Sequence, residues 1–107
     1  MTQRPEPGFV FMVFHYPEPG HAEALAEGMR EMGAHLTGQP GLLEVDPPWW
    51  DEQHQALVGI SRWASEAAFV AVMQVPSGAA VPAGERQPRQ RFYFTSASPG
   101  TSPDHTD

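Results

Sequence analysis

The segment from Phe9 to Tyr16 is apolar at almost every position, rather than at every second position. Successive side chains of a β-strand point to opposite faces of a sheet. A strand formed by this segment therefore places apolar side chains on both faces of its sheet, and both faces need a cover. The remaining sequence predicts only two helices, which suffice for one face. We expect a second copy of the chain to cover the other, because a large exposed apolar patch is unusual on a monomer.

Composition limits the partners of the chain. Its 107 residues are enough for one domain, and no apolar run approaches the roughly 20 residues that span a membrane. There are 13 acidic residues against 6 arginines and no lysine, and the net charge of −7 leaves no basic surface for nucleic acid. We therefore predict neither a nucleic-acid partner nor a membrane partner.

Sequence motifs for metals and cofactors are also missing. The chain has no cysteine, which excludes disulfides and thiolate ligands. Its histidines show no spacing such as His-x-x-x-His, and no glycine-rich loop leads from an expected strand into a helix. We predict no metal site and no cofactor. The first residues lack the basic-then-apolar pattern of a signal peptide, so we expect a cytoplasmic protein.

Two segments predict helices and four predict strands. From His21 to Thr37, apolar residues recur at spacings of three and four, which places them on one helical face; these are Ala22, Leu25, Met29, Met32 and Leu36. A second helix is expected from Ser65, a good N-cap, to Val75. Strands are expected at 9–16, 42–50, 55–63 and 91–95. The second of these contains Pro47 and Pro48, which cannot donate ladder hydrogen bonds, so we expect it at an edge or bulged.

The order β-α-β-β-α-β is that of the ferredoxin-like α+β fold. Both helices then pack on one face of a four-stranded antiparallel sheet. We assign residues 9–96 to this domain, residues 1–8 to a flexible lead-in and residues 97–107 to a disordered tail.

Four stretches of the chain resemble the antibiotic biosynthesis monooxygenase (ABM) family. They are FVFMVFHYPEPG leading into HAEALAEGMREMGAHL, the turn GQPGLLEV, the strand ALVGISRW and the helix start ASEAAF. The resemblance implies a dimeric α+β barrel, in which two subunits oppose their sheets. It also implies cofactor-independent oxidation of a hydrophobic aromatic such as a polyketide or quinol.

The resemblance extends to individual positions. Trp63 matches a tryptophan at the end of the third strand of the polyketide oxygenases. Gly59 stands where those enzymes have an asparagine, and Phe69 where they have a tyrosine. Arg86 or Arg89 takes the place of their arginine after the second helix. The haem-degrading members need other residues at the positions of Val13, Val72 and Pro82, and we predict no haem degradation of that type.

Other candidate residues follow from strand alternation. His15 shares a face with Phe11 and Val13, and can enter a pocket between sheet and helices as a base with a pKa near neutrality, or serve as a hydrogen-bonded structural residue. Tyr93 and Arg91 share a face of the last strand and can orient a phenolate or carboxylate, unless Tyr93 belongs to a dimer core. Trp63 either contacts substrate or seals the end of the sheet.

These interpretations combine into one functional hypothesis. We predict a homodimer with an apolar pocket in each subunit, and oxidation by oxygen of a small hydrophobic aromatic bound there. The predicted catalytic residues are Trp63, His15 and Tyr93, and the predicted substrate contacts are Phe11, Val13, Gly59, Phe69, Met73 and Arg86. The alternatives are a non-catalytic homodimer that binds an apolar ligand, and an isomerase or cyclase on the same scaffold.

Overall fold

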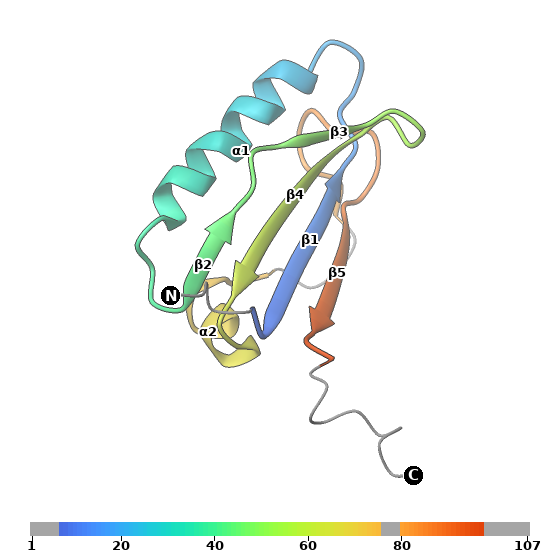
Figure 1. Cartoon of the computed structure of the whole chain (residues 1–107). Coiled ribbons are helices and arrows are strands. Elements are labelled where there is room, and N and C mark those ends of the chain that lie inside the picture. Colours follow the sequence, from blue (N-terminus) through green and yellow to red (C-terminus); the bar gives the residue numbers. More distant parts are fainter. Residues whose placement is uncertain (1–6, 76–79, 98–107) are drawn as a thin grey trace, which may run out of the picture.

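The computed structural model describes residues 7–75 and 80–97 and contains two helices and five strands (Figure 1). The predicted lead-in and tail fall largely at 1–6 and 98–107, outside the described residues. In chain order the elements are β1 (Phe9–His15), α1 (Ala22–Leu36), β2 (Leu42–Val45), β3 (Trp49–Asp51), β4 (Ala56–Trp63), α2 (Glu66–Val72) and β5 (Gln90–Thr95).

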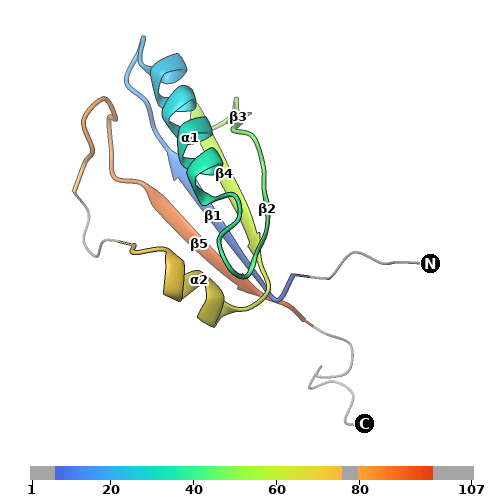
Figure 2. The ribbon, with the colours of Figure 1, turned by 90° about the vertical axis from the view of Figure 1, so that its left-hand side faces the viewer.

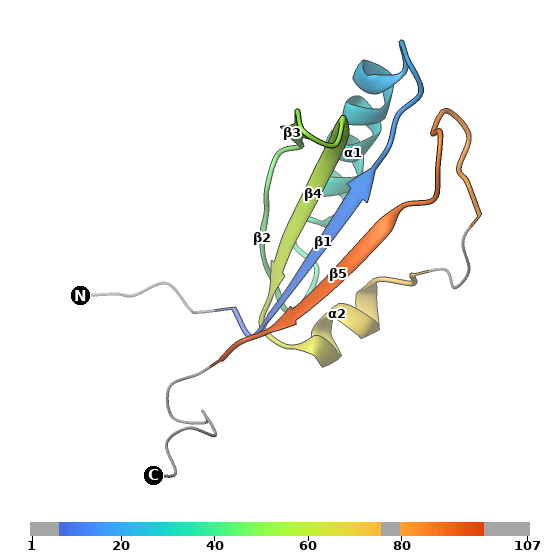
Figure 3. The ribbon, with the colours of Figure 1, turned by 90° about the vertical axis from the view of Figure 1, so that its right-hand side faces the viewer.

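The strands form one antiparallel sheet in the order β2-β4-β1-β5, and β3 also pairs with β4. Both helices lie on the same face of this sheet, as Figure 2 shows, and Figure 3 gives the view onto the opposite face. The predicted α+β ferredoxin-like fold is confirmed. Neither helix within the described residues has the length and apolarity to cross a membrane.

The predicted strand at 42–50 is two short strands rather than one. It is interrupted between Val45 and Trp49, where Pro47 and Pro48 lie, and its register shifts between Leu42 and Glu44. Proline has no N–H to donate to the ladder. Both pieces pair only with β4, so the expected edge position is confirmed.

The register assigns each residue of β1 to a face. Phe11 lies opposite Ser61 on β4 and Tyr93 on β5, and Val13 lies opposite Gly59 and Arg91. Directly paired residues share a face. The Phe9, Phe11, Val13 and His15 side of β1 faces the helices, since Phe9 and Phe11 pack with Phe69 of α2. Tyr93 and Arg91 therefore lie on the helix-facing side as well.

An aromatic cluster joins α2 to the sheet. Its buried members are Phe9, Phe11, Trp63 and Phe69. The Phe69 ring centroid lies 4.9 Å from that of Phe11 and 5.6 Å from that of Trp63, the second pair in an edge-to-face arrangement. Ser65 caps α2 by accepting a hydrogen bond from the Ala68 N–H at 3.1 Å.

The opposite face of the sheet is apolar too. Val10, Met12 and Phe14 of β1 are only half-buried, and Phe92 and Phe94 of β5 keep 38% and 47% of their surface exposed. Figure 3 shows no described helix across this face. The layer with apolar side chains on both sides, expected from the first strand, is present.

Candidate functional site

A cavity of about 430 Å³ lies between the helix-facing side of the sheet and α1. Its apolar walls include Phe11 and Val13 from β1, Met29 and Leu36 from α1, and Met73 just after α2. The apolar stripe predicted for α1 thus borders a cavity as well as a core. Ala26 is the buried residue of the helix, whereas Met32, also on the cavity wall, is 55% exposed.

Gly59 of β4 keeps this cavity open. A Cβ at this position would lie 3.2 Å from Cε of Met29 and 3.3 Å from Cγ1 of Val13. A side chain here would therefore press against both walls. Glycine weakens the interior of a strand. At this position the missing side chain leaves space that belongs to the cavity.

One end of the cavity is polar and contains His15, Arg89 and Arg91. The His15 side chain is 10% exposed, and its Nδ1 has no hydrogen-bond partner among the described residues. The nearest carboxylate oxygen to Nδ1 is Oε2 of Glu85, at 3.9 Å. Burial, aided by the positive charges of Arg89 and Arg91 and opposed by Glu85, lowers the pKa of His15 to about 4. The near-neutral pKa expected from the sequence is therefore wrong, and His15 is uncharged at pH 7.

The Glu85 side chain is fully buried and is held by Arg89. Nη2 of Arg89 donates to Oε2 at 2.7 Å, and Nε lies 3.0 Å from Oε2 and 3.2 Å from Oε1. Glu85 is brought to this position by an isolated bridge to Pro17, just beyond β1. Glu85 was not predicted as a site residue, because it lies in a proline- and glycine-rich segment without periodicity.

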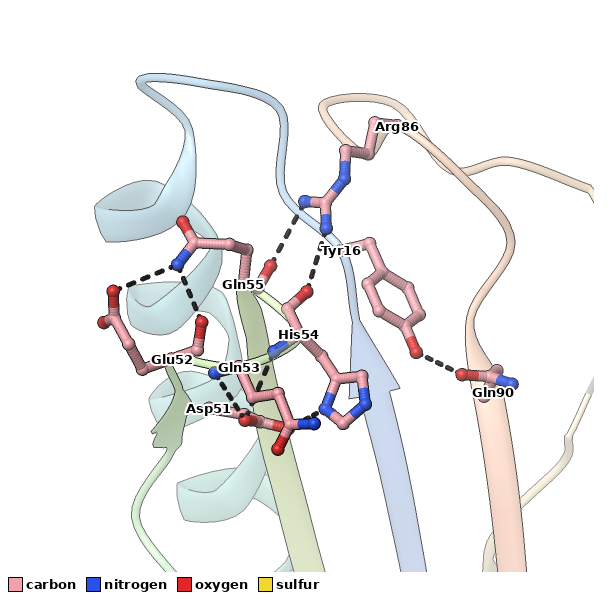
Figure 4. Close-up of polar contacts among 8 residues, drawn as sticks. All are labelled: Tyr16, Asp51, Glu52, Gln53, His54, Gln55, Arg86 and Gln90. Carbon is pink, nitrogen blue, oxygen red and sulfur yellow. Dashed lines mark hydrogen bonds and ion pairs between the residues drawn. The ribbon is translucent and has the colours of Figure 1, made fainter.

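Arg86 lies at the end of the sheet beyond the cavity, although it was predicted to contact substrate (Figure 4). Its guanidinium donates to the backbone oxygens of Gln55 at 3.1 Å and His54 at 3.0 Å, and also to Pro17 O at 2.9 Å. It lies over the Tyr16 ring, 5.3 Å from the centroid. Arg86 therefore fastens the β3–β4 turn to the end of β1.

The same turn carries its own polar contacts, also drawn in Figure 4. Nδ1 of His54 lies 2.6 Å from Oδ2 of Asp51, and this bond is the main reason that the pKa of Asp51 is lowered. The Tyr16 hydroxyl donates to Oε1 of Gln90, and burial raises the pKa of that tyrosine. The contacts of Asp51 and His54 order the turn, and that of Tyr16 joins the end of β1 to the start of β5. None of these residues lines the cavity.

Trp63, Phe69 and Tyr93 belong to the aromatic cluster and do not line the cavity. Trp63 has no exposed surface, and its Nε1 donates to Oγ of Ser61 at 2.9 Å. Ser61 lines the cavity and Trp63 does not. Trp63 is therefore connected to the cavity only through its hydrogen bond to the Ser61 hydroxyl. Of the nine residues predicted to be catalytic or to contact substrate, the cavity brings together five, namely Phe11, Val13, His15, Gly59 and Met73. The further candidates Arg89 and Arg91 also line it.

This arrangement fits acid–base chemistry on an apolar molecule. An uncharged imidazole can accept a proton, and a neighbouring guanidinium can stabilise the anion that forms. Within residues 7–75 and 80–97, no three histidine, aspartate or glutamate side chains are grouped to hold a metal ion.

Comparison with known proteins identifies the fold. No family model and no curated protein matches the sequence. Among solved structures, Rv0793 from Mycobacterium tuberculosis superposes with a TM-score of 0.66 at 14% identity, over 87% of this chain and 98% of that one. An antibiotic biosynthesis monooxygenase gives a TM-score of 0.61 at 16% identity, over 82% and 97% of the two chains.

The chain shares the fold of this antibiotic biosynthesis monooxygenase. The heme-degrading protein Rv3592 from Mycobacterium tuberculosis shares it, with a TM-score of 0.59 at 18% identity over 81% of this chain and 89% of that one. At such identities the likeness concerns the ABM-like fold alone.

Proposed function

We propose that the chain is a cofactor-independent monooxygenase that oxidises a hydrophobic aromatic molecule bound between α1 and the sheet. The observation that carries the proposal is an apolar cavity of about 430 Å³ that ends on a buried, uncharged histidine. Small-molecule sites commonly occupy roughly 300–1,000 Å³ and combine apolar walls with a few polar groups. The ABM-like fold supports the same proposal.

In the proposed reaction His15 acts as the base. It accepts a proton from an activated CH₂ group flanked by aromatic rings, and the carbanion passes an electron to oxygen. The resulting radical pair combines into a peroxide anion, which takes the proton back from His15. Loss of water from the hydroperoxide leaves a carbonyl, so that R₂CH₂ and O₂ give R₂C=O and H₂O. His15 is neutral at pH 7 and has a lone pair for this proton. Its lowered pKa makes it a weak base, so the step depends on stabilisation of the anion by the neighbouring guanidinium.

The proposal includes a homodimer. Phe92 and Phe94 are exposed on the face away from the helices, beside the half-buried Val10 and Met12. A second copy that opposes the same face would remove these side chains from water, at about 25 cal/mol for each Å² of apolar surface. The expected partners are therefore the chain itself and a small hydrophobic molecule.

One observation favours a second candidate, a dimer that binds an apolar ligand without reaction. Trp63 is fully buried and its Nε1 is bonded to Ser61, so its indole has no face toward the cavity. A catalytic role for Trp63 through electron transfer would have to act through Ser61. An isomerase or cyclase would use His15 without consuming oxygen.

Oxygen consumption with anthrone separates these functions. We expect the purified chain to consume oxygen and form anthraquinone, and His15→Gln to lower the rate by about 100-fold, as is typical when a general base is lost. His35→Gln is the matched control, because His35 lies on the exposed side of α1. Binding of anthrone with no oxygen uptake above buffer would overturn the monooxygenase. Recovery of unchanged anthrone would then support the non-catalytic dimer, and conversion of anthrone without oxygen uptake the isomerase or cyclase.

A further inference from the structure

The polar end of the cavity carries one positive charge without a counterion. Arg89 is neutralised by the buried carboxylate of Glu85 at 2.7 Å, and His15 is uncharged at pH 7. Arg91 also lines the cavity, yet its guanidinium makes no hydrogen bond or ion pair with any residue that the structure describes. The remaining charge at this end is therefore that of Arg91.

The position of Arg91 directs this charge toward the cavity. It pairs with Val13 across β1 and β5, and so shares the helix-facing side with His15. Its side chain is half-buried, which weakens the screening of its charge by water. The positive charges of Arg89 and Arg91 both lower the pKa of His15.

Other acidic groups near the cavity do not neutralise Arg91. Asp46 borders the cavity on the β2 side, but its carboxylate accepts from Arg62. Glu85 has no exposed side-chain surface and both its oxygens accept from Arg89. A ligand is therefore the remaining source of a counterion at this end.

We propose that the ligand is an aromatic carboxylic acid whose carboxylate pairs with the guanidinium of Arg91, beside His15. The inference rests on the proposed function and narrows its substrate class. The planar guanidinium fork matches a carboxylate in a two-bond geometry. Nδ1 of His15 is buried against Glu85, which leaves Nε2 as the ring nitrogen that meets the ligand.

The apolar walls and the charge then have separate roles. Phe11, Val13, Met29 and Met73 take up the aromatic ring system, and Arg91 fixes its orientation. An apolar ligand without an acid group would cover Arg91 and leave its charge partly desolvated and unpaired. This costs free energy of binding, and a ligand carboxylate that pairs with Arg91 would remove that cost.

Two probes that differ only in charge test the inference. Binding of 2-naphthoate and of 2-naphthalenemethanol to the full chain is measured by calorimetry at pH 7.5. We expect the wild-type chain to bind naphthoate at least about tenfold more tightly, the difference that one charge-assisted pair confers. Arg91→Met should abolish the preference, and Arg91→Lys should retain part of it.

Arg30→Met is the matched control. It removes the same charge from the half-exposed face of α1, where Arg30 bonds Glu27, and it should preserve the preference. Equal affinity of the wild-type chain for the two probes would overturn the inference while leaving the cavity as a ligand site. A preference that survives in folded Arg91→Met would also overturn it. If neither probe binds, the proposed function fails together with the inference.

Discussion

The buried carboxylate of Glu85 and the guanidinium of Arg89 form a two-oxygen ion pair at the polar end of the cavity, with Nη2 2.7 Å from Oε2. This pair joins the segment before β5 to the end of β1, because Glu85 also bridges to Pro17. It neutralises Arg89 and leaves Arg91 as the cation for a ligand. The charge of the cavity therefore depends on a residue that does not line it.

We predict that Arg89→Met destabilises the chain by about 3 kcal/mol, because it leaves the Glu85 carboxylate buried without a counterion. This value is at the lower end of the usual range, since the Arg89 side chain keeps 30% of its surface exposed. The measurement is the free energy of unfolding in urea. Adding Glu85→Gln to Arg89→Met should recover part of the loss. If the double variant is less stable than Arg89→Met alone, burial of an unpaired charge is not the cause.

We predict that the stability of the chain falls as the pH is lowered through the histidine range. His15 titrates near 6.5 when unfolded and at about 4 when folded. Between these values the unfolded chain binds a proton that the folded chain does not, so acid favours unfolding. The shift in the pKa of His15 corresponds to a decrease of about 3 kcal/mol in the free energy of unfolding between pH 7 and pH 4.

Urea unfolding of wild type, His15→Gln and His35→Gln at pH 7.5, 6, 5 and 4 isolates this contribution. His15→Gln should show a shallower decline than wild type, whereas His35→Gln, altered on the exposed side of α1, should follow wild type. Parallel curves for wild type and His15→Gln would contradict the lowered pKa of His15.

Local patterns were sufficient to predict the architecture. The continuous apolar run at the first strand and the spacings of three and four in the first helix predicted β1 and α1 within one residue at each end. Strand alternation also grouped His15 with Phe11 and Val13, which the cavity brings together. These features depend only on neighbours in the sequence.

Features that depend on distant contacts were not predictable in the same way. The position of Glu85 follows from its bridge to Pro17, and that of Arg86 from bonds to Pro17, His54 and Gln55. Their segment has no periodicity that would indicate either contact. The pKa of His15 likewise depends on burial and on two arginines that lie more than 70 residues away in the chain.

We predict that Gly59→Ala reduces the affinity for 2-naphthalenemethanol by about fivefold, which corresponds to about 1 kcal/mol of crowding. The new methyl group would lie 3.2 Å from Cε of Met29 and 3.3 Å from Cγ1 of Val13, both on the cavity wall. Calorimetry gives the affinity. Gly20→Ala adds the same group away from the cavity, where no atom lies within 4 Å, and should leave the affinity unchanged. Unchanged affinity in Gly59→Ala would show that ligands bind elsewhere.

We predict that Arg86→Met costs about 2 kcal/mol of stability, because three backbone oxygens lose a charged donor. Arg30→Met removes an exposed helical pair with Glu27 and should cost less than about 0.5 kcal/mol. Thermal or urea unfolding compares the two variants. Similar losses of stability in Arg86→Met and Arg30→Met would mean that Arg86 does not hold the β3–β4 turn to the end of β1.

We predict that Gly41→Ala is more damaging than Gly20→Ala, although the two glycines have nearly the same backbone angle, with φ of 83° and 84°. Both substitutions place a side chain in the left-handed region, at about 1 kcal/mol each. A Cβ at Gly41 would also lie 2.4 Å from Cβ of Ala68 on α2, whereas one at Gly20 meets nothing within 4 Å. We therefore expect Gly41→Ala to lower the free energy of unfolding by about 3 kcal/mol, because crowding adds to the backbone strain. Gly20→Ala, which has the strain alone, should lower it by about 1 kcal/mol.

Urea unfolding of both variants, and of Gly41→Ala combined with Ala68→Gly, completes this test. Ala68→Gly removes the atom that the new methyl group would contact. The double variant should therefore lose less free energy of unfolding than the two single variants together. Strict additivity would show that the turn before β2 does not press against α2. A non-additive result would establish that the turn before β2 is in contact with α2, the helix that carries Phe69 of the aromatic cluster.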